Sequence, residues 1–334
     1  MNPLHGHQKA IAAFRAGLDS GRLHHAWLIS GPQGIGKGLF ARKAALRLLA
    51  EGQTPFSTPG LDVPPHHAAA KLFESGAHPD FRIVEREVWE KPGVLLSHEK
   101  RNGTEEPARS IRVDQIRWLR ASLAGTTSLS ARRAVVIDSV DDLETAGANA
   151  LLKSLEEPPA STIFLLVSHA PERLLPTIRS RCRSLRLGSL GRADMEAALR
   201  SALPSATAPE IAALAEVGEG APGRAVAYRG LDVPALDAAM RTIGETGDPA
   251  NQHRSELAQA LAVKAAAPRY EAFLNRAPSF IAAAARTRRG PRLAEAVKLW
   301  EQASMLSATA LRQSLDPQAT VFEMGTLLAG LSDR

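Results

Sequence analysis

The segment with the clearest chemistry is a glycine-rich stretch, Gly31-Pro32-Gln33-Gly34-Ile35-Gly36-Lys37-Gly38. It follows a short apolar run, 25–30, and opens a helical pattern, which is the setting of the phosphate-binding loop G-x-x-x-x-G-K-[ST]. Glycines let backbone N–H groups turn toward phosphate oxygens, and the N-terminus of the following helix adds positive potential. We therefore predict a nucleotide-binding loop in which Lys37 reaches the terminal phosphates.

The last position of this loop departs from the pattern, because Gly38 stands where a Ser or Thr hydroxyl would hold Mg²⁺. A second departure comes after the apolar run 134–137. Asp138 occupies the place of the acidic metal ligand, but Ser139 follows where ATPases of this design usually carry a Glu that activates water. The loop keeps groups that can hold ATP or ADP, and we predict that it does not hydrolyse them.

Other residues near these motifs admit a structural and a functional interpretation. We interpret Asp141 and Asp142 as charges that cap a helix N-terminus. Arg181 is either a surface ion-pair partner or an arginine finger that enters the nucleotide site of a neighbouring subunit. Cys182 is interpreted as a packing residue, because no His and acid partners stand in evident register with it.

Five short apolar runs predict the strands that position these residues. They are separated by segments long enough for crossover helices, which predicts a parallel sheet buried on both faces. The runs cover residues 25–30, 81–84, 134–137, 163–167 and 184–187. The sequence therefore predicts a three-layer α/β domain over residues 1–188.

The second half of the chain has a different character. After about residue 190 the pattern is Ala- and Leu-rich with helical periodicity, and it is interrupted by glycine and proline at 218–223 and 246–249. We predict a small helical domain over 189–236 and a larger all-helical domain over 237–334.

Two regions of the first half interrupt the alternation of strands and helices. Residues 51–79 are rich in proline and are expected to be loop with some helix. Residues 89–109 are polar, and we expect an exposed insertion to which the sequence assigns no role.

The composition is that of a globular protein, with 44% hydrophobic and 23% charged residues among 334. No apolar run is long enough to span a membrane, and the N-terminus lacks a signal pattern, so we expect a cytoplasmic protein. The single cysteine excludes an internal disulfide and a multi-cysteine zinc site. A net charge of +6 is compatible with a polyanionic partner such as DNA without requiring one.

Several motifs together resemble the clamp-loader AAA+ subunits of bacterial DNA polymerase III. The most specific are Asn149-Ala150-Leu151-Leu152-Lys153-Ser154-Leu155-Glu156-Glu157-Pro158-Pro159 and the later Ser180-Arg181-Cys182. The resemblance also includes Gly6-His7, His78-Pro79-Asp80, the segment 111–117 and the segment 220–225. It covers the first half in detail, and the C-terminal region matches only weakly.

The resemblance implies a RecA-like AAA+ P-loop domain, a helical lid domain and an all-helical collar through which subunits associate. It implies that Arg181 is an arginine finger, catalytic in trans. It also implies that Ser168 occupies the sensor-1 position and that Arg224 is the sensor-2 arginine, beside a nucleotide site that is degenerate. Many members carry a four-cysteine zinc module after the P-loop helix. This chain has one cysteine, so we predict no zinc and no required cofactor.

The role that the resemblance implies is that of a non-hydrolysing stator in DNA replication. Its partners would be the gamma/tau ATPase subunits and the delta subunit, and the complex would place the sliding clamp on primed DNA. The chain would then have no ATPase activity of its own, as part of the DNA-directed DNA polymerase holoenzyme, a nucleotidyltransferase. The alternatives are an active gamma/tau-type ATPase subunit and, more remotely, an unrelated P-loop kinase or DNA-repair helicase.

Overall fold

The computed structural model describes residues 2–87, 89–91, 94–95 and 108–332. The chain forms two compact units, Met1–Val226 and Ala227–Arg334. Most of the predicted insertion 89–109 lies outside the described residues. Its described parts, β3 (Trp89–Lys91) and β4 (Val94–Leu95), pair in antiparallel fashion.

The first unit is built on a parallel sheet. Its strands are β1 (Ala26–Ser30), β2 (Phe81–Glu85), β5 (Arg133–Asp138), β6 (Thr162–Ser168) and β7 (Arg183–Arg186). They lie in the order β2-β5-β6-β1-β7, and each neighbouring pair is parallel. The five predicted strands and the parallel sheet are confirmed.

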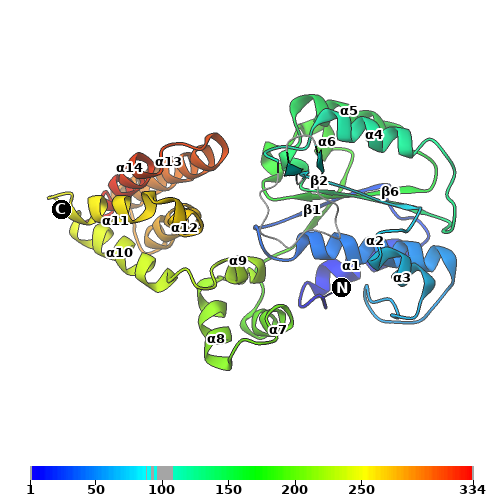
Figure 1. Ribbon diagram of the computed structural model, residues 1–334, viewed down its shortest axis with the longest axis horizontal. Helices are drawn as coiled ribbons and strands as arrows, with labels where there is room; N and C mark the ends of the chain where they lie inside the picture. The colour runs from blue at the N-terminus through cyan, green and yellow to red at the C-terminus, as the bar shows by residue number, and fades with distance from the viewer. Residues whose placement is uncertain (1, 88, 92–93, 96–107, 333–334) are drawn as a thin grey trace. The chain divides into compact units, whose positions relative to one another are not determined.

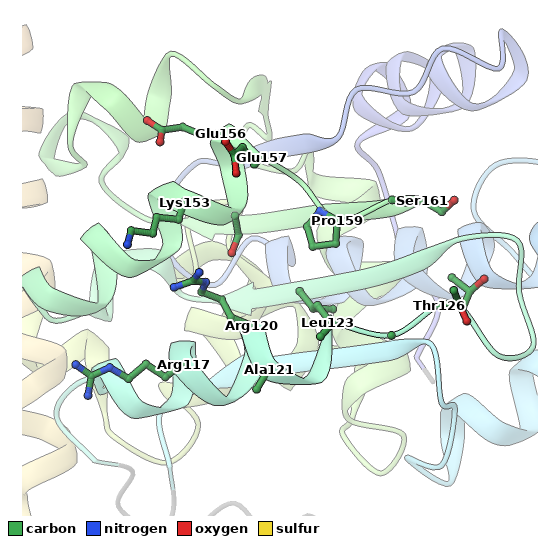
Figure 2. A pocket seen from close by; sticks show the side chains of 15 residues that line it. Arg117, Arg120, Ala121, Leu123, Thr126, Lys153, Glu156, Glu157, Pro159 and Ser161 are labelled. Carbon is green, nitrogen blue, oxygen red and sulfur yellow. The ribbon is translucent and has the colours of Figure 1, made fainter.

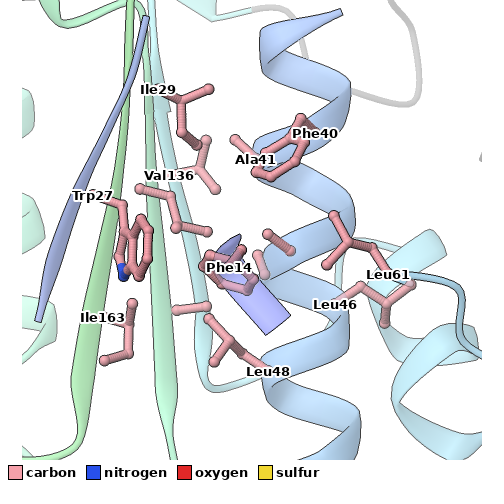
Figure 3. Close-up of a cluster of buried hydrophobic side chains, with 14 of the residues drawn as sticks. Phe14, Trp27, Ile29, Phe40, Ala41, Leu46, Leu48, Leu61, Val136 and Ile163 are labelled. Carbon is pink, nitrogen blue, oxygen red and sulfur yellow. The ribbon is translucent and has the colours of Figure 1, made fainter. Parts of the chain in front are cut away.

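Helices cover both faces of this sheet (Figure 1). One face packs against α1 (Gln8–Asp19), α2 (Lys37–Gln53) and α3 (Ala68–Glu74), and the other against α4 (Val113–Ser122), α5 (Thr145–Glu156) and α6 (Pro176–Arg179). Strand side chains alternate between the two cores. Trp27 and Ile29 enter the first, shown in Figure 3, while Ala26 and Leu28 enter the second. A strand buried on both faces must be apolar throughout, which explains the continuous runs.

The rest of the chain is helical within the described residues. The first unit ends with α7 (Arg192–Ala202), α8 (Ala208–Val217) and most of α9 (Pro222–Ala227), which share a small core. The second unit contains α10 (Val233–Thr246), α11 (Gln252–Ala262), α12 (Ala267–Arg286), α13 (Pro291–Gln313) and α14 (Pro317–Ala329). The described residues also form the 3-10 turns η2 (Val140–Asp142), η3 (Pro171–Arg173) and η4 (Lys264–Ala266). In the described part of the chain, no helix combines the length and the apolar character that crossing a membrane requires.

The predicted division into three domains stays a prediction. The boundary at 188/189 falls in the segment between β7 and α7, whereas the boundary at 236/237 falls inside α10. The compact units divide earlier, after Val226.

Residues 51–79 contain the end of α2, the helix α3 and an irregular segment that a buried arginine organises. Arg47 on α2 is 1% exposed and donates to the backbone oxygens of Thr58 and Asp62 at 3.0 and 2.7 Å. Its Nε donates to Glu51 at 2.6 Å. A paired guanidinium therefore ties this loop to the helix that follows the glycine-rich loop.

Candidate functional site

The glycine-rich loop connects β1 to α2 and has the conformation that its glycines allow. Gly31, Gly34 and Gly36 have φ angles of 147°, 80° and 96°, which side chains strongly disfavour. A Cβ on Gly31 would meet the Leu187 carbonyl oxygen at 2.2 Å. These three glycines are therefore needed for the path of the loop itself.

Lys37 is directed back onto its own loop. Its Nζ donates to the carbonyl oxygens of Gly31 and Pro32 at 2.7 and 2.6 Å, and the residue is 3% exposed. Burial lowers the pKa of Lys37 to about 8, against the opposing effect of the Asp138 and Asp141 carboxylates. Two of its three N–H donors are thus committed to protein oxygens.

The space beside Gly38 is taken by Asp138. A Cβ on Gly38 would lie 2.3 Å from Asp138 Oδ2, so the carboxylate occupies the place from which a Ser or Thr hydroxyl would start. Burial raises the pKa of Asp138, although the charges of Arg42 and Lys37 lower it. One carboxylate without a neighbouring hydroxyl is a poor fit for the Mg²⁺ of a hydrolysing P-loop.

Asp141 and Asp142 lie in the first turn of η2, so their predicted place at a helix start is confirmed, but the interpretation of Asp141 as a cap is wrong. Its carboxylate joins the turn after β5 to the end of β6, because it accepts hydrogen bonds from the Ser139 and Ser168 hydroxyls at 3.0 and 2.9 Å. It also accepts from the backbone N–H groups of His169 and Ala170 at 2.6 and 3.2 Å. Ser168, the predicted sensor-1 residue, and Ser139, at the position of the missing base, both donate to this carboxylate.

The segment 220–225, in the predicted lid domain, packs directly on the glycine-rich loop. The Gly223 N–H donates to the Gly34 carbonyl oxygen at 2.8 Å, and a Cβ on Gly34 would meet the Arg224 backbone nitrogen at 2.6 Å. The Arg224 side chain pairs instead with Glu219 at 3.0 Å. The predicted sensor-2 arginine therefore contacts the loop through its backbone, while its guanidinium is bound to a residue of its own segment.

A cleft of about 440 Å³ adjoins the loop, and Lys37, Gly38 and Asp138 line it. Its other walls come from the N-terminal residues 2–5, from α7 and from the start of α9. The N-terminal segment is fixed beside it, because His7 Nε2 lies 2.8 Å from the Ile35 carbonyl oxygen. His169, which sequence reasoning did not single out, also lines the cleft, and burial lowers its pKa to about 4.

Arg181 lies at the edge of the sheet where the parallel strands begin, opposite the edge where they end and where the glycine-rich loop lies. It precedes β7, whose first residues pair with Trp27 and Leu28 of β1, whereas the glycine-rich loop follows Ser30 at the other end of that strand. At about 3.3 Å per residue, a strand of this length separates the two by about 13 Å. Arg181 therefore cannot serve the phosphates of its own loop.

The same edge carries a groove of about 1070 Å³ between the C-terminal ends of α4 and α5. Figure 2 shows Arg117 and Arg120 of α4 and Lys153 of α5 extending to the same side of it. Glu156 and Glu157 line its other part. Cys182, beside Arg181, packs against the sheet, and burial raises the pKa of its thiol to about 12, which makes it a poor nucleophile.

Comparison with known proteins identifies the family. The family model described as "DNA polymerase III, delta subunit" matches residues 6–191. The chain belongs to this family. Together with the sheet order and the glycine-rich loop, this membership confirms the predicted AAA+ P-loop fold of the first unit.

The similar curated proteins are polymerase III subunits. The chain is 36% identical over 209 residues to the delta' subunit of Pseudomonas aeruginosa, covering 63% of this chain and 57% of that protein. It is 34% identical over 176 residues to the delta' subunit of Escherichia coli, covering 53% and 45%. A gamma/tau subunit of Mycobacterium tuberculosis is 33% identical over 177 residues, covering 53% and 26%. The chain thus spans about half the length of the curated delta' relatives it matches.

Among solved structures, a gamma subunit-related protein of Thermotoga maritima aligns over 92% of this chain and 94% of that one. Its TM-score is 0.39 and its sequence identity is 16%.

The structure thus separates the predicted site residues into two groups. Gly34, Gly36, Lys37, Gly38 and Asp138 line one cleft, while Gly31, Ser168 and Arg224 lie in neighbouring segments. Arg181 stands apart at the other edge. Sequence reasoning missed His169 in the cleft, and it missed the role of Asp141, whose partners at Ser168 to Ala170 lie 27 to 29 positions away, so no local pattern could reveal them.

Proposed function

We propose that this chain acts as the delta' subunit of the DNA polymerase III clamp loader. In this role it does not hydrolyse nucleotide itself, and it supplies Arg181 as an arginine finger to the ATP site of the adjacent ATPase subunit. The observation that carries the proposal is the contrast between the two sheet edges. Beside the chain's own loop, Lys37 binds loop carbonyl oxygens and Asp138 takes the place of a hydroxyl at Gly38, and a partly exposed arginine stands at the far edge.

The chain's own loop supports the non-hydrolysing part of this role. Hydrolysis requires a hydroxyl and a carboxylate on Mg²⁺ and a base that activates water. Gly38 has no hydroxyl, and Ser139 is not a base. The backbone of the loop can still hold a phosphate, so occupancy by ATP or ADP stays a prediction, as does the absence of zinc and of a required cofactor.

The position of Arg181 supports the activating part. An arginine finger stabilises the charge that develops on the transferred phosphoryl group, and it contributes about 10³–10⁵ in rate. Such a residue must be accessible to a second subunit, and the Arg181 side chain is 34% exposed.

The proposed partners are the gamma/tau ATPase subunits and the delta subunit, which together with this chain load the sliding clamp onto primed DNA. The helical second unit is proposed as the collar through which the subunits associate. Net charge of +6 and the cationic side of the α4–α5 groove complement DNA phosphates, which supports a complex that surrounds DNA.

The test is ATP turnover by the gamma/tau and delta subunits with clamp and primed DNA. It is measured without this chain, with it, and with its Arg181→Ala variant. We expect stimulation by the wild-type chain and loss of at least tenfold of that stimulated rate in the variant, because the transition-state charge loses its partner. Equal stimulation by both chains would remove the finger assignment, and no stimulation by either would contradict the clamp-loader role.

The second candidate, an active gamma/tau-type ATPase, is favoured by relatives of that name at 30–33% identity. It predicts ATP turnover by the isolated chain. The proposal predicts none above background, and Gly38 is the main reason.

A further inference from the structure

The Arg181 guanidinium is held in place by groups of its own chain. Its Nη2 pairs with Glu156 Oε1 at 2.8 Å, and its Nη1 donates to the Thr177 carbonyl oxygen at 2.9 Å. The Glu156 side chain is 47% exposed. The pair therefore lies on the surface, where it contributes little to the stability of the fold.

Glu156 stands at an unusual place for a carboxylate. It is the last residue of α5, where the helix dipole disfavours negative charge. The end of this helix is firmly positioned, because Leu155 is 1% exposed and His25 Nε2 lies 3.1 Å from the Leu155 carbonyl oxygen. Helix stability does not account for a carboxylate here, whereas a contact to Arg181 does.

We propose that Glu156 is a positioning residue for Arg181, an inference that rests on the proposed function. A guanidinium has five N–H donors; Thr177 engages one of them, and the Glu156 carboxylate pairs with the charge at Nη2. The others remain for the phosphate oxygens of the neighbouring subunit. Arginine has a long flexible side chain, so orienting it before the subunits meet removes an entropy loss from the reaction step.

The test compares two adjacent carboxylates in the same ATPase assay of the complete loader. Glu156→Gln removes the charge that faces Arg181. Glu157→Gln removes the neighbouring charge, which forms no ion pair with Arg181 among the described residues. We expect Glu156→Gln to lower the stimulated kcat by about two- to fivefold with little change in KM for ATP, the range expected from an exposed ion pair. Glu157→Gln should change neither.

A double variant makes the test specific. In the Arg181→Ala background, Glu156→Gln should have no further effect, because the group that it positions is gone. Circular dichroism and thermal unfolding of each variant check that the fold is intact.

Three results would overturn the inference while leaving the finger assignment in place. They are an unchanged or raised rate in Glu156→Gln, an equal fall in Glu156→Gln and Glu157→Gln, and a further fall when Glu156→Gln is added to Arg181→Ala. Full stimulation by Arg181→Ala is a different result, since it would overturn the finger assignment and this inference together.

Discussion

The two edges of the parallel sheet present different groups: one carries a glycine-rich loop without the hydroxyl of the P-loop pattern, and the other carries Arg181 and a groove. At the edge with the glycine-rich loop, Lys37 and the backbone at Gly223 contact the loop itself, Asp138 lies against Gly38, and a cleft of about 440 Å³ remains beside them. At the opposite edge the Arg181 side chain is partly exposed, and its ion-pair partner Glu156 lines a groove. Backbone groups of Gly223 and Arg224 contact the glycine-rich loop, whereas Glu156 and the basic residues of the groove at the other edge lie on the surface, where a second molecule can reach them.

The two edges are also ordered by different means. The loop edge is held by glycines in contact with backbone. The other edge is held by buried charges that bind backbone groups. Asp80 accepts N–H bonds from Ser128, Leu129 and Ser130 at 2.7, 2.7 and 2.8 Å. Arg133 donates to carbonyl oxygens of the same connection, at Leu123, Gly125 and Thr126.

The largest effect is expected from Asp80→Ala, because it removes a buried carboxylate and leaves three N–H groups, including that of the buried Ser130, without their acceptor. We expect a loss of about 3–5 kcal/mol in the free energy of unfolding, measured by urea denaturation. Asp114→Ala is the control, because that side chain is 77% exposed. A loss of less than about 1 kcal/mol in the free energy of unfolding of Asp80→Ala would show that other contacts order the edge of the sheet that carries Arg181.

The same carboxylate gives a pH dependence with a definite sign. Burial alone would raise the pKa of Asp80, but the three N–H groups and His78 outweigh it, so the pKa is lowered. A lowered pKa in the folded state stabilises the fold above the unfolded value of about 3.9. This stability is lost as the pH falls through the folded pKa. Urea denaturation of Asp80→Asn should therefore depend less on pH below 4 than that of the wild-type chain.

The contact between the glycine-rich loop and residues 223–224 is tested by Gly34→Ala. The residue has φ of 80°, and its new Cβ would meet the Arg224 backbone nitrogen at 2.6 Å. We expect a loss of about 2 kcal/mol or more in the free energy of unfolding, or separation of the lid from the loop seen as faster amide exchange at Gly223. Gly188→Ala is the matched control, since nothing lies within 4 Å of its Cβ position. Equal behaviour of the two variants would contradict the close contact.

The smallest effect is expected from Lys37→Ala, on the clamp-loading activity of the complex. Lys37→Ala should change clamp loading on primed DNA by less than about twofold, because the chain's own site is proposed to be silent. Its thermal unfolding is measured alongside, since the variant also loses two hydrogen bonds to carbonyl oxygens. A large loss of loading by a folded variant would show that the loop still uses nucleotide.

Local patterns were sufficient to predict the five strands and the two positions at which the nucleotide-binding motifs lack their usual side chains. The five strands follow from continuous apolar runs, because a strand covered on both faces has no polar side to show. Gly38 and Ser139 are visible as departures because the P-loop pattern assigns each position a chemical group. The role of His78-Pro79-Asp80 was not evident, because the loop that Asp80 binds lies about 50 residues further along the chain.

The sequence by itself determined the parallel sheet, the glycine-rich loop and the absence of its magnesium hydroxyl, since each depends on side-chain type and short-range spacing. Only the tertiary structure decided where the remaining polar groups are directed. Lys37 binds its own loop, Asp141 binds the end of β6, and Arg181 binds Glu156. For Asp141 and Arg181 the partner comes from a distant segment, and for Lys37 the outcome depends on how the loop is packed. Packing of the whole sheet with its helices therefore sets these contacts.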